Sequence, residues 1–126
     1  MSYLTISHSS TEHQEWLHSL DFYDSELDIL EKWLAEIAKK NNKTEVLTGV
    51  EHFQNQFIIQ RNNIDILSHH INEHMHKNML NEMSYSLQTE KILALEHDQL
   101  EDEFKMFEKV VNELRKEYNL YLSKWM

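Results

Sequence analysis

The sequence contains no cysteine and no proline, and its only glycine is Gly49. Without cysteine the chain has no disulfide bond, no thiolate metal ligand and no cysteine nucleophile, so a metal site must use nitrogen and oxygen ligands. Architectures rich in turns need proline and glycine, and the scarcity of both favours long helices. What the chain does have is an unusual number of histidines, nine in all.

Basic side chains are scarce as well, with 12 Lys and Arg against 22 Asp and Glu, for a formal net charge of −10. This sign argues against nucleic acids and anionic lipid surfaces as partners. The first residues lack a signal-peptide pattern and no stretch is apolar enough to span a bilayer, so we expect a cytoplasmic protein. The 126 residues, 40% of them hydrophobic, are expected to form one domain around a single core.

Apolar residues recur at alternating steps of three and four along three segments, the spacing that lines one face of a helix. The segments cover about residues 10–40, 44–80 and 86–125, and the pattern is interrupted near Asn42 and Tyr85. Ser9 and Glu12 have the spacing of a capping box, which predicts that the first helix begins there. Long helices joined by short turns predict an all-α, up-down-up antiparallel bundle. Gln60, in the middle of the second segment, is expected to be a buried polar residue that fixes the helix register.

Each of the three apolar patterns is interrupted by one histidine, namely His13, His74 and His97. Pairing the helices about the two turns brings these histidines to the same end of the bundle. His70 and Glu101 lie one helical turn from His74 and His97 and extend the cluster. Imidazole and carboxylate groups from neighbouring helices bind Zn, Fe, Mn or Ni inside bundles, so these five residues are candidate ligands for a divalent metal.

Two interpretations of this histidine cluster remain open at this point. A polar layer at the end of the core, where histidines contact water, explains the pattern without a metal. A metal site requires neutral imidazoles, and its affinity should weaken as the pH falls through roughly 6.5, the ordinary pKa of histidine.

A longer pattern across residues 51–102 resembles the ligand pattern of hemerythrin-like di-iron proteins, which is HxxxE, HxxxH and HxxxxD on three helices of a four-helix bundle. The resemblance implies a break in the second helix near residues 62–64 and a bridged pair of irons that binds dioxygen or senses oxygen and metal. The implied ligands are His52, His70, His74, His97 and Asp102, with Gln56 where the family has a bridging glutamate.

The sequence lacks the short motifs that identify common classes of enzyme. No glycine-rich phosphate loop and no nucleophile motif is present, so we expect a non-enzymatic structural or interaction module. The segment EHFQNQFIIQ is similar to short, wholly helical bacterial proteins, a resemblance that implies no activity. Several apolar residues beside the main patterns exceed what a three-helix rod can cover, which favours a homodimer or another protein partner. They are Phe22, Ile29, Trp33, Ile58, Ile66, Met106 and Val110.

Overall fold

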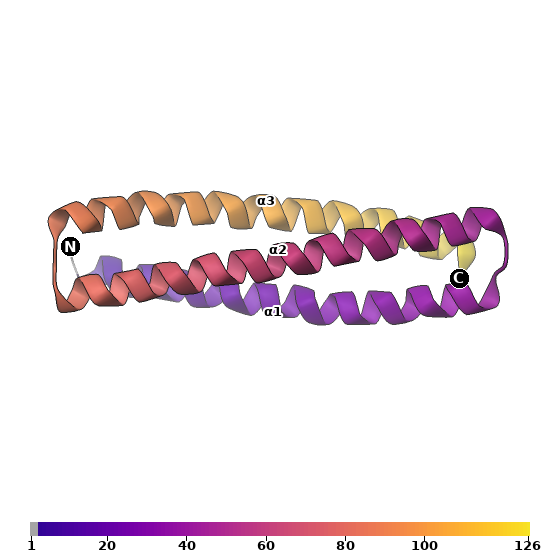
Figure 1. The fold of residues 1–126 in the computed structure, drawn as a ribbon, viewed down its shortest axis with the longest axis horizontal. Helices are drawn as coiled ribbons and strands as arrows, with labels where there is room; N and C mark the ends of the chain where they lie inside the picture. Colours follow the sequence, from indigo (N-terminus) through magenta and orange to yellow (C-terminus); the bar gives the residue numbers. More distant parts are fainter. Residues whose placement is uncertain (1–2) are drawn as a thin grey trace.

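The computed structural model describes residues 3–126, with side chains from Ser10 onward. It consists of three helices, α1 (Tyr3–Lys40), α2 (Thr44–Met83) and α3 (Leu87–Trp125), of 38 to 40 residues each. At 1.5 Å per residue each helix is about 60 Å long. They lie side by side, with α2 antiparallel to α1 and α3 (Figure 1). The predicted all-α bundle of three antiparallel helices is confirmed.

The two turns lie where the apolar pattern is interrupted, at residues 41–43 and 84–86. Ser86 caps α3 by accepting a hydrogen bond at 3.3 Å from the backbone N–H of Thr89. The side-chain oxygen of Asn81 in turn accepts the backbone N–H of Ser86 at 3.1 Å. These bonds fix how the chain leaves α2 and enters α3, directly beside the cluster of histidines.

Two of the predicted boundaries are corrected by the structure. Helix α1 begins at Tyr3 and passes through Ser9, so the predicted capping box does not start the helix. The side chain of Ser9 lies outside the described residues. No glycine or proline stops the helix before Ser10, and serine costs only about 0.5 kcal/mol relative to alanine inside a helix. Helix α2 continues to Met83, past the predicted end at residue 80.

The alternative of four helices, with a break near residues 62–64, is wrong. Helix α2 is unbroken there, and the buried side chains of Ile64 and Leu67 keep the core pattern in phase. Just before this point, the Arg61 guanidinium donates to the carboxylates of Asp24 and Glu31 on α1. Arg61 therefore links α2 to α1 through ion pairs directly beside residues 62–64.

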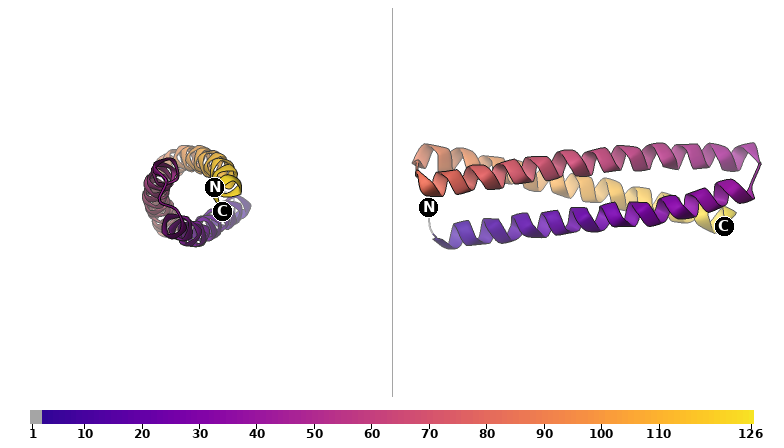
Figure 2. Two further views of the ribbon diagram at one scale, coloured as in Figure 1. Left: turned by 90° about the vertical axis from the view of Figure 1, so that its right-hand side faces the viewer. Right: turned by 60° about the horizontal axis from the view of Figure 1, so that its bottom comes forward.

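The three helices are arranged around a common axis, as the end-on view shows (Figure 2), and their buried side chains form one hydrophobic core along the bundle. Tyr118 is fully buried, and its hydroxyl donates to the carbonyl oxygen of Leu30 at 2.7 Å. Gln60 is 2% exposed, so its predicted burial is confirmed, and its side-chain oxygen accepts from Asn63 at 3.3 Å. None of the described helices has an apolar stretch of the length needed to cross a membrane.

Gly49 is required by a close contact between α2 and α3. A Cβ atom built on this residue would lie 2.5 Å from Cε2 of Tyr121, nearer than real side chains approach. The Tyr121 ring is held there because its hydroxyl donates to the carbonyl oxygen of Val46 at 2.6 Å. The glycine therefore gives the tyrosine ring access to the backbone of α2.

Candidate metal site

The site lies at the end of the bundle where α1 begins, α2 ends and α3 begins (Figures 1 and 2). Each helix contributes one of His13, His74 and His97, as the sequence predicts. The ring centroids are 4.9 Å apart for His13 and His74, 5.0 Å for His13 and His97, and 5.9 Å for His74 and His97. One nitrogen from each ring lies within 4.8 Å of the other two. The bundle thus has a cluster that can hold a metal ion.

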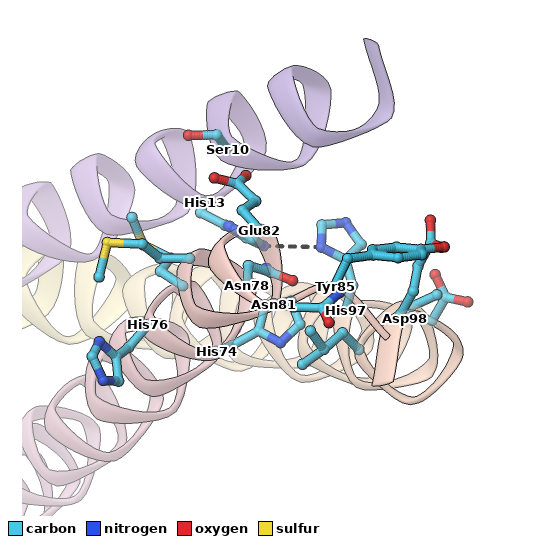
Figure 3. A pocket seen from close by; sticks show the side chains of 15 residues that line it. Ser10, His13, His74, His76, Asn78, Asn81, Glu82, Tyr85, His97 and Asp98 are labelled. Carbon is cyan, nitrogen blue, oxygen red and sulfur yellow. Dashed lines mark hydrogen bonds between the residues drawn. The ribbon is translucent and has the colours of Figure 1, made fainter. Parts of the chain in front are cut away.

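A chain of hydrogen bonds orients His97 and His13. Nε2 of His97 lies 2.7 Å from Oε2 of Glu12, and its Nδ1 lies 3.0 Å from Nε2 of His13 (Figure 3). A carboxylate only accepts hydrogen bonds, so Nε2 of His97 carries the hydrogen donated to Glu12. In the neutral ring Nδ1 of His97 then has a lone pair directed at His13, which donates to it through Nε2.

A second carboxylate orients His74 in the same way. Nδ1 of His74 donates to Oε1 of Glu96 at 2.8 Å, and the ammonium of Lys77 holds the other oxygen of that carboxylate at 3.3 Å. Because Nδ1 carries the hydrogen, Nε2 of the neutral ring has the lone pair. The hydrogen bond to Glu96 therefore leaves Nε2 as the nitrogen of His74 that could bind a metal.

Burial keeps the two inner histidines uncharged at neutral pH. His13 and His74 are 2% and 1% exposed. The pKa of His13 is lowered from 6.5 to about 4, mainly by desolvation and also by the neighbouring His74 and His97, against the opposing effect of Glu12. Desolvation also lowers the pKa of His74, against the opposing effect of Glu96. For Glu96, desolvation raises the pKa, but hydrogen bonds from His74 and Lys77 outweigh it and the net shift is downward.

The other two predicted ligands lie outside this group of three. Glu101 forms a neighbouring group with Glu12 and His97, and one of its oxygens contacts the Lys105 ammonium at 2.9 Å. His70 has an exposed side chain on the flank of α2, and its Nδ1 is 3.5 Å from Oε2 of Glu103.

Of the ligands implied by the hemerythrin-like resemblance, His52, His70 and His74 lie along α2, whereas His97 and Asp102 lie on α3. His52 contacts Glu117 at 2.8 Å. It is 22 residues from His74 on the same continuous helix, roughly 33 Å away at 1.5 Å per residue. The two histidines therefore belong to different regions of the bundle.

Two carboxylates that orient the cluster, Glu12 and Glu96, were not predicted in this role. The sequence pattern places Glu12 in a capping box, and no motif in the sequence singles out Glu96. Each directly precedes a histidine, which puts it on the flank of its helix facing the neighbouring helix. That position beside a core histidine is the sequence signal that could have identified both.

A cavity of about 790 Å³ adjoins the cluster, and side chains from all three helices line it (Figure 3). The three histidines form part of its wall. Around them lie apolar and acidic side chains, including Met75, Met79, Leu93, Glu82 and Asp98. The site therefore combines three imidazoles with an adjacent space large enough for a small molecule.

Comparison with known proteins adds no relative, because the chain matches no protein-family model, no curated protein and no solved structure. Function is therefore inferred from the cluster itself. The observations that bear on it are the convergence of three imidazoles, their anchoring carboxylates and the cavity beside them.

Proposed function

We propose that the protein binds one zinc ion at the end of the bundle through Nε2 of His13, Nε2 of His74 and Nδ1 of His97. The observation that carries this proposal is the anchoring of His74 and His97 by carboxylates through their other ring nitrogens. Metal-ligating histidines characteristically donate their second ring N–H to a carboxylate or carbonyl, which fixes the tautomer and the ring orientation. Three imidazoles with an open fourth position suit zinc.

The rearrangement needed for binding is small. Zn–N bonds of 2.0 to 2.1 Å in a tetrahedral site place the ligand nitrogens about 3.3 Å from one another. Nε2 of His13 and Nδ1 of His97 are 3.0 Å apart, and one nitrogen from each of the three rings lies within 4.8 Å of the other two, so the widest separation in that set must shrink by at most about 1.5 Å. The hydrogen on Nε2 of His13 has to move to Nδ1, a change of tautomer within a neutral ring.

Charge and protonation also favour a divalent cation. Glu12 and Glu96 place negative charge beside the cluster, the latter shared with Lys77, in a protein whose formal net charge is −10. The lowered pKa values of His13 and His74 mean that a metal meets unprotonated rings at these two positions at neutral pH. Competition from protons at these two ligands is therefore shifted below the pH of 6.5 expected for ordinary histidines.

The test is elemental analysis of the full-length protein, produced in metal-replete medium and purified without chelator. We expect close to one zinc per chain, and we expect zinc to be lost in His74→Gln and His97→Gln. The matched control is His70→Gln, one turn before His74 on the same helix, which should retain the metal. Circular dichroism of each variant separates loss of a ligand from loss of the fold.

The outcomes separate the competing interpretations. Wild-type protein without metal, and with no change in melting temperature when zinc is added, would leave the cluster as a hydrogen-bonded polar layer. Loss of metal in His70→Gln would favour the wider set of five ligands predicted from the sequence. Two irons per chain, together with sensitivity to His52→Ala, would favour a hemerythrin-like centre. With zinc at 100 times its Kd, we expect a stabilisation of about 2.7 kcal/mol, or roughly 10 °C in Tm.

Self-association into a homodimer is a second candidate function, supported by large apolar side chains left in contact with solvent. Phe22, Ile58 and Met106, one on each helix, are 57 to 60% exposed. Exposed apolar side chains of this size mark an interaction surface where they form a contiguous patch. Light scattering of the purified protein tests this directly, with an expected mass of twice 15.3 kDa. A monomer at high micromolar concentration would contradict it.

A further inference from the structure

The cavity beside the three histidines has the position and size of a ligand-binding chamber. Its volume of about 790 Å³ lies within the range of small-molecule sites, about 300 to 1,000 Å³. His13, His74 and His97 all line it, so a metal held by them faces the cavity with its remaining coordination position. Structural zinc sites are closed by four protein ligands, whereas sites with three protein ligands take water or an external ligand as the fourth.

The charged residues that line the cavity determine whether an anionic or a cationic external ligand is favoured. Among the described residues that line it, none is lysine or arginine, while Glu82 and Asp98 contribute carboxylates. An anion would therefore meet like charges at Glu82 and Asp98. A cation would instead meet complementary charge.

The cavity is also lined by apolar side chains, which can contact the uncharged part of a ligand. Met75, Met79, Leu93 and Ala94 line the same cavity from α2 and α3. Methionine side chains are flexible and polarizable, and they adapt to flat or irregular apolar groups. A ligand that spans the chamber would place a metal-binding atom at the histidines and its apolar body along these side chains.

We propose that the cavity binds a small organic cation that coordinates the metal through a neutral nitrogen donor and directs its positive charge to Glu82 and Asp98. This inference rests on the proposed zinc site. It adds that the metal is a ligand-binding centre rather than only a structural one. The chemical class is that of aromatic or heterocyclic amines, in which a basic ring nitrogen and an ammonium group lie at opposite ends.

Three probes with the same donor and different charge test the proposal on the full-length protein loaded with Co²⁺, a coloured substitute for zinc. They are 4-(aminomethyl)pyridine, 4-methylpyridine and pyridine-4-carboxylate, which carry a positive, a neutral and a negative group at pH 7. The para geometry prevents any of them from chelating the metal. Coordination is measured from the change in the visible absorption of Co²⁺, and we expect the cation to bind about fivefold or more tightly than the neutral probe, with the anion weakest.

Asp98→Asn and Asp102→Asn form a matched pair of variants for this titration. Both remove one carboxylate from α3, but only Asp98 lines the cavity, because Asp102 lies one turn further along the helix. We expect Asp98→Asn to reduce the preference for the cationic probe severalfold, whereas Asp102→Asn should leave it unchanged.

Each outcome has a distinct meaning. If the protein takes up no Co²⁺ or Zn²⁺, the proposed zinc site and this inference both fail. If it takes up the metal but none of the probes changes the spectrum, the zinc site stands and the ligand chamber is refuted. If all three probes bind equally, or if both aspartate variants behave alike, the selection of a cation by the cavity walls is refuted.

Discussion

Replacement of Gly49 by alanine gives a sharp test of the packing between α2 and α3, because two effects of known size oppose each other. Alanine favours a helix interior over glycine by about 1 kcal/mol, so the substitution alone should stabilise α2. In the folded protein, however, the new Cβ atom would lie 2.5 Å from Cε2 of Tyr121, and the ring must move by about 1 Å to restore an ordinary contact.

That movement has a cost that the structure allows us to work out. It breaks the 2.6 Å hydrogen bond from the Tyr121 hydroxyl to the carbonyl oxygen of Val46, worth about 1 kcal/mol. It also disturbs the contact of the Tyr121 ring with Phe53, 5.1 Å away between centroids, which is worth about another 1 kcal/mol. Together with strain in the repacked core, the cost is about 2 to 3 kcal/mol. We therefore expect Gly49→Ala to destabilise the protein by about 1 to 2 kcal/mol.

The control is the same substitution made in a Tyr121→Ala background. Without the ring, only the helix propensity remains, and Gly49→Ala should now stabilise the protein by about 1 kcal/mol. The effect thus changes sign, which corresponds to a coupling of about 2 to 3 kcal/mol between the two positions. Urea denaturation of metal-free protein, followed by circular dichroism, measures all four variants. Stabilisation by Gly49→Ala in the wild-type background would refute the close approach of Tyr121 to α2.

Two further predictions concern charged groups. Metal-free protein should lose stability as the pH falls from 6.5 to 4, because the unfolded chain protonates His13 in this window while the folded chain, in which its pKa is lowered to about 4, does not. His13 alone contributes about 3 kcal/mol to this loss, and urea denaturation at several pH values should show a shallower dependence in His13→Phe. Arg61→Met should cost about 1 kcal/mol at low salt, because Arg61 bonds to three partly exposed carboxylates on α1, and less in 1 M NaCl. An unchanged cost at high salt would contradict an electrostatic origin.

The fold follows from the sequence because its main determinants are local. The apolar spacing sets the helix faces, and pairing those faces about the turns near Asn42 and Tyr85 sets their register. The same reasoning brings His13, His74 and His97 together, since each continues the apolar pattern of its own helix, with His13 and His74 buried and His97 partly buried. Helix ends are less well determined, because the start of α1 depends on small differences in propensity between neighbouring residues.

Gly49 shows what such reasoning misses. Its position near the start of α2 suggests a glycine that lowers the stability of the helix slightly without serving a purpose. The structure shows instead that the ring of Tyr121, 72 residues later in the chain, requires a glycine at this position. A periodic pattern identifies which residues face the core, but it does not say which ring lies against which stretch of backbone. Contacts of this kind depend on the rotation and separation of whole helices, and they emerge only when the helices are placed in three dimensions.

The positions of His70 and His74 show that sequence spacing also leaves the composition of the site undetermined. Residues four apart lie one above the other on a helix, which suggested that both belong to the cluster. A spacing of four nevertheless rotates the direction of a side chain by about 40°, since 3.6 residues complete a turn. His74 continues the series of buried residues that includes Leu67 and Ile71, whereas His70 precedes Ile71 and lies on the exposed flank beside Glu103. In a three-helix bundle this rotation separates a buried ligand from an exposed surface residue, and it is why His70→Gln is the informative control for metal binding.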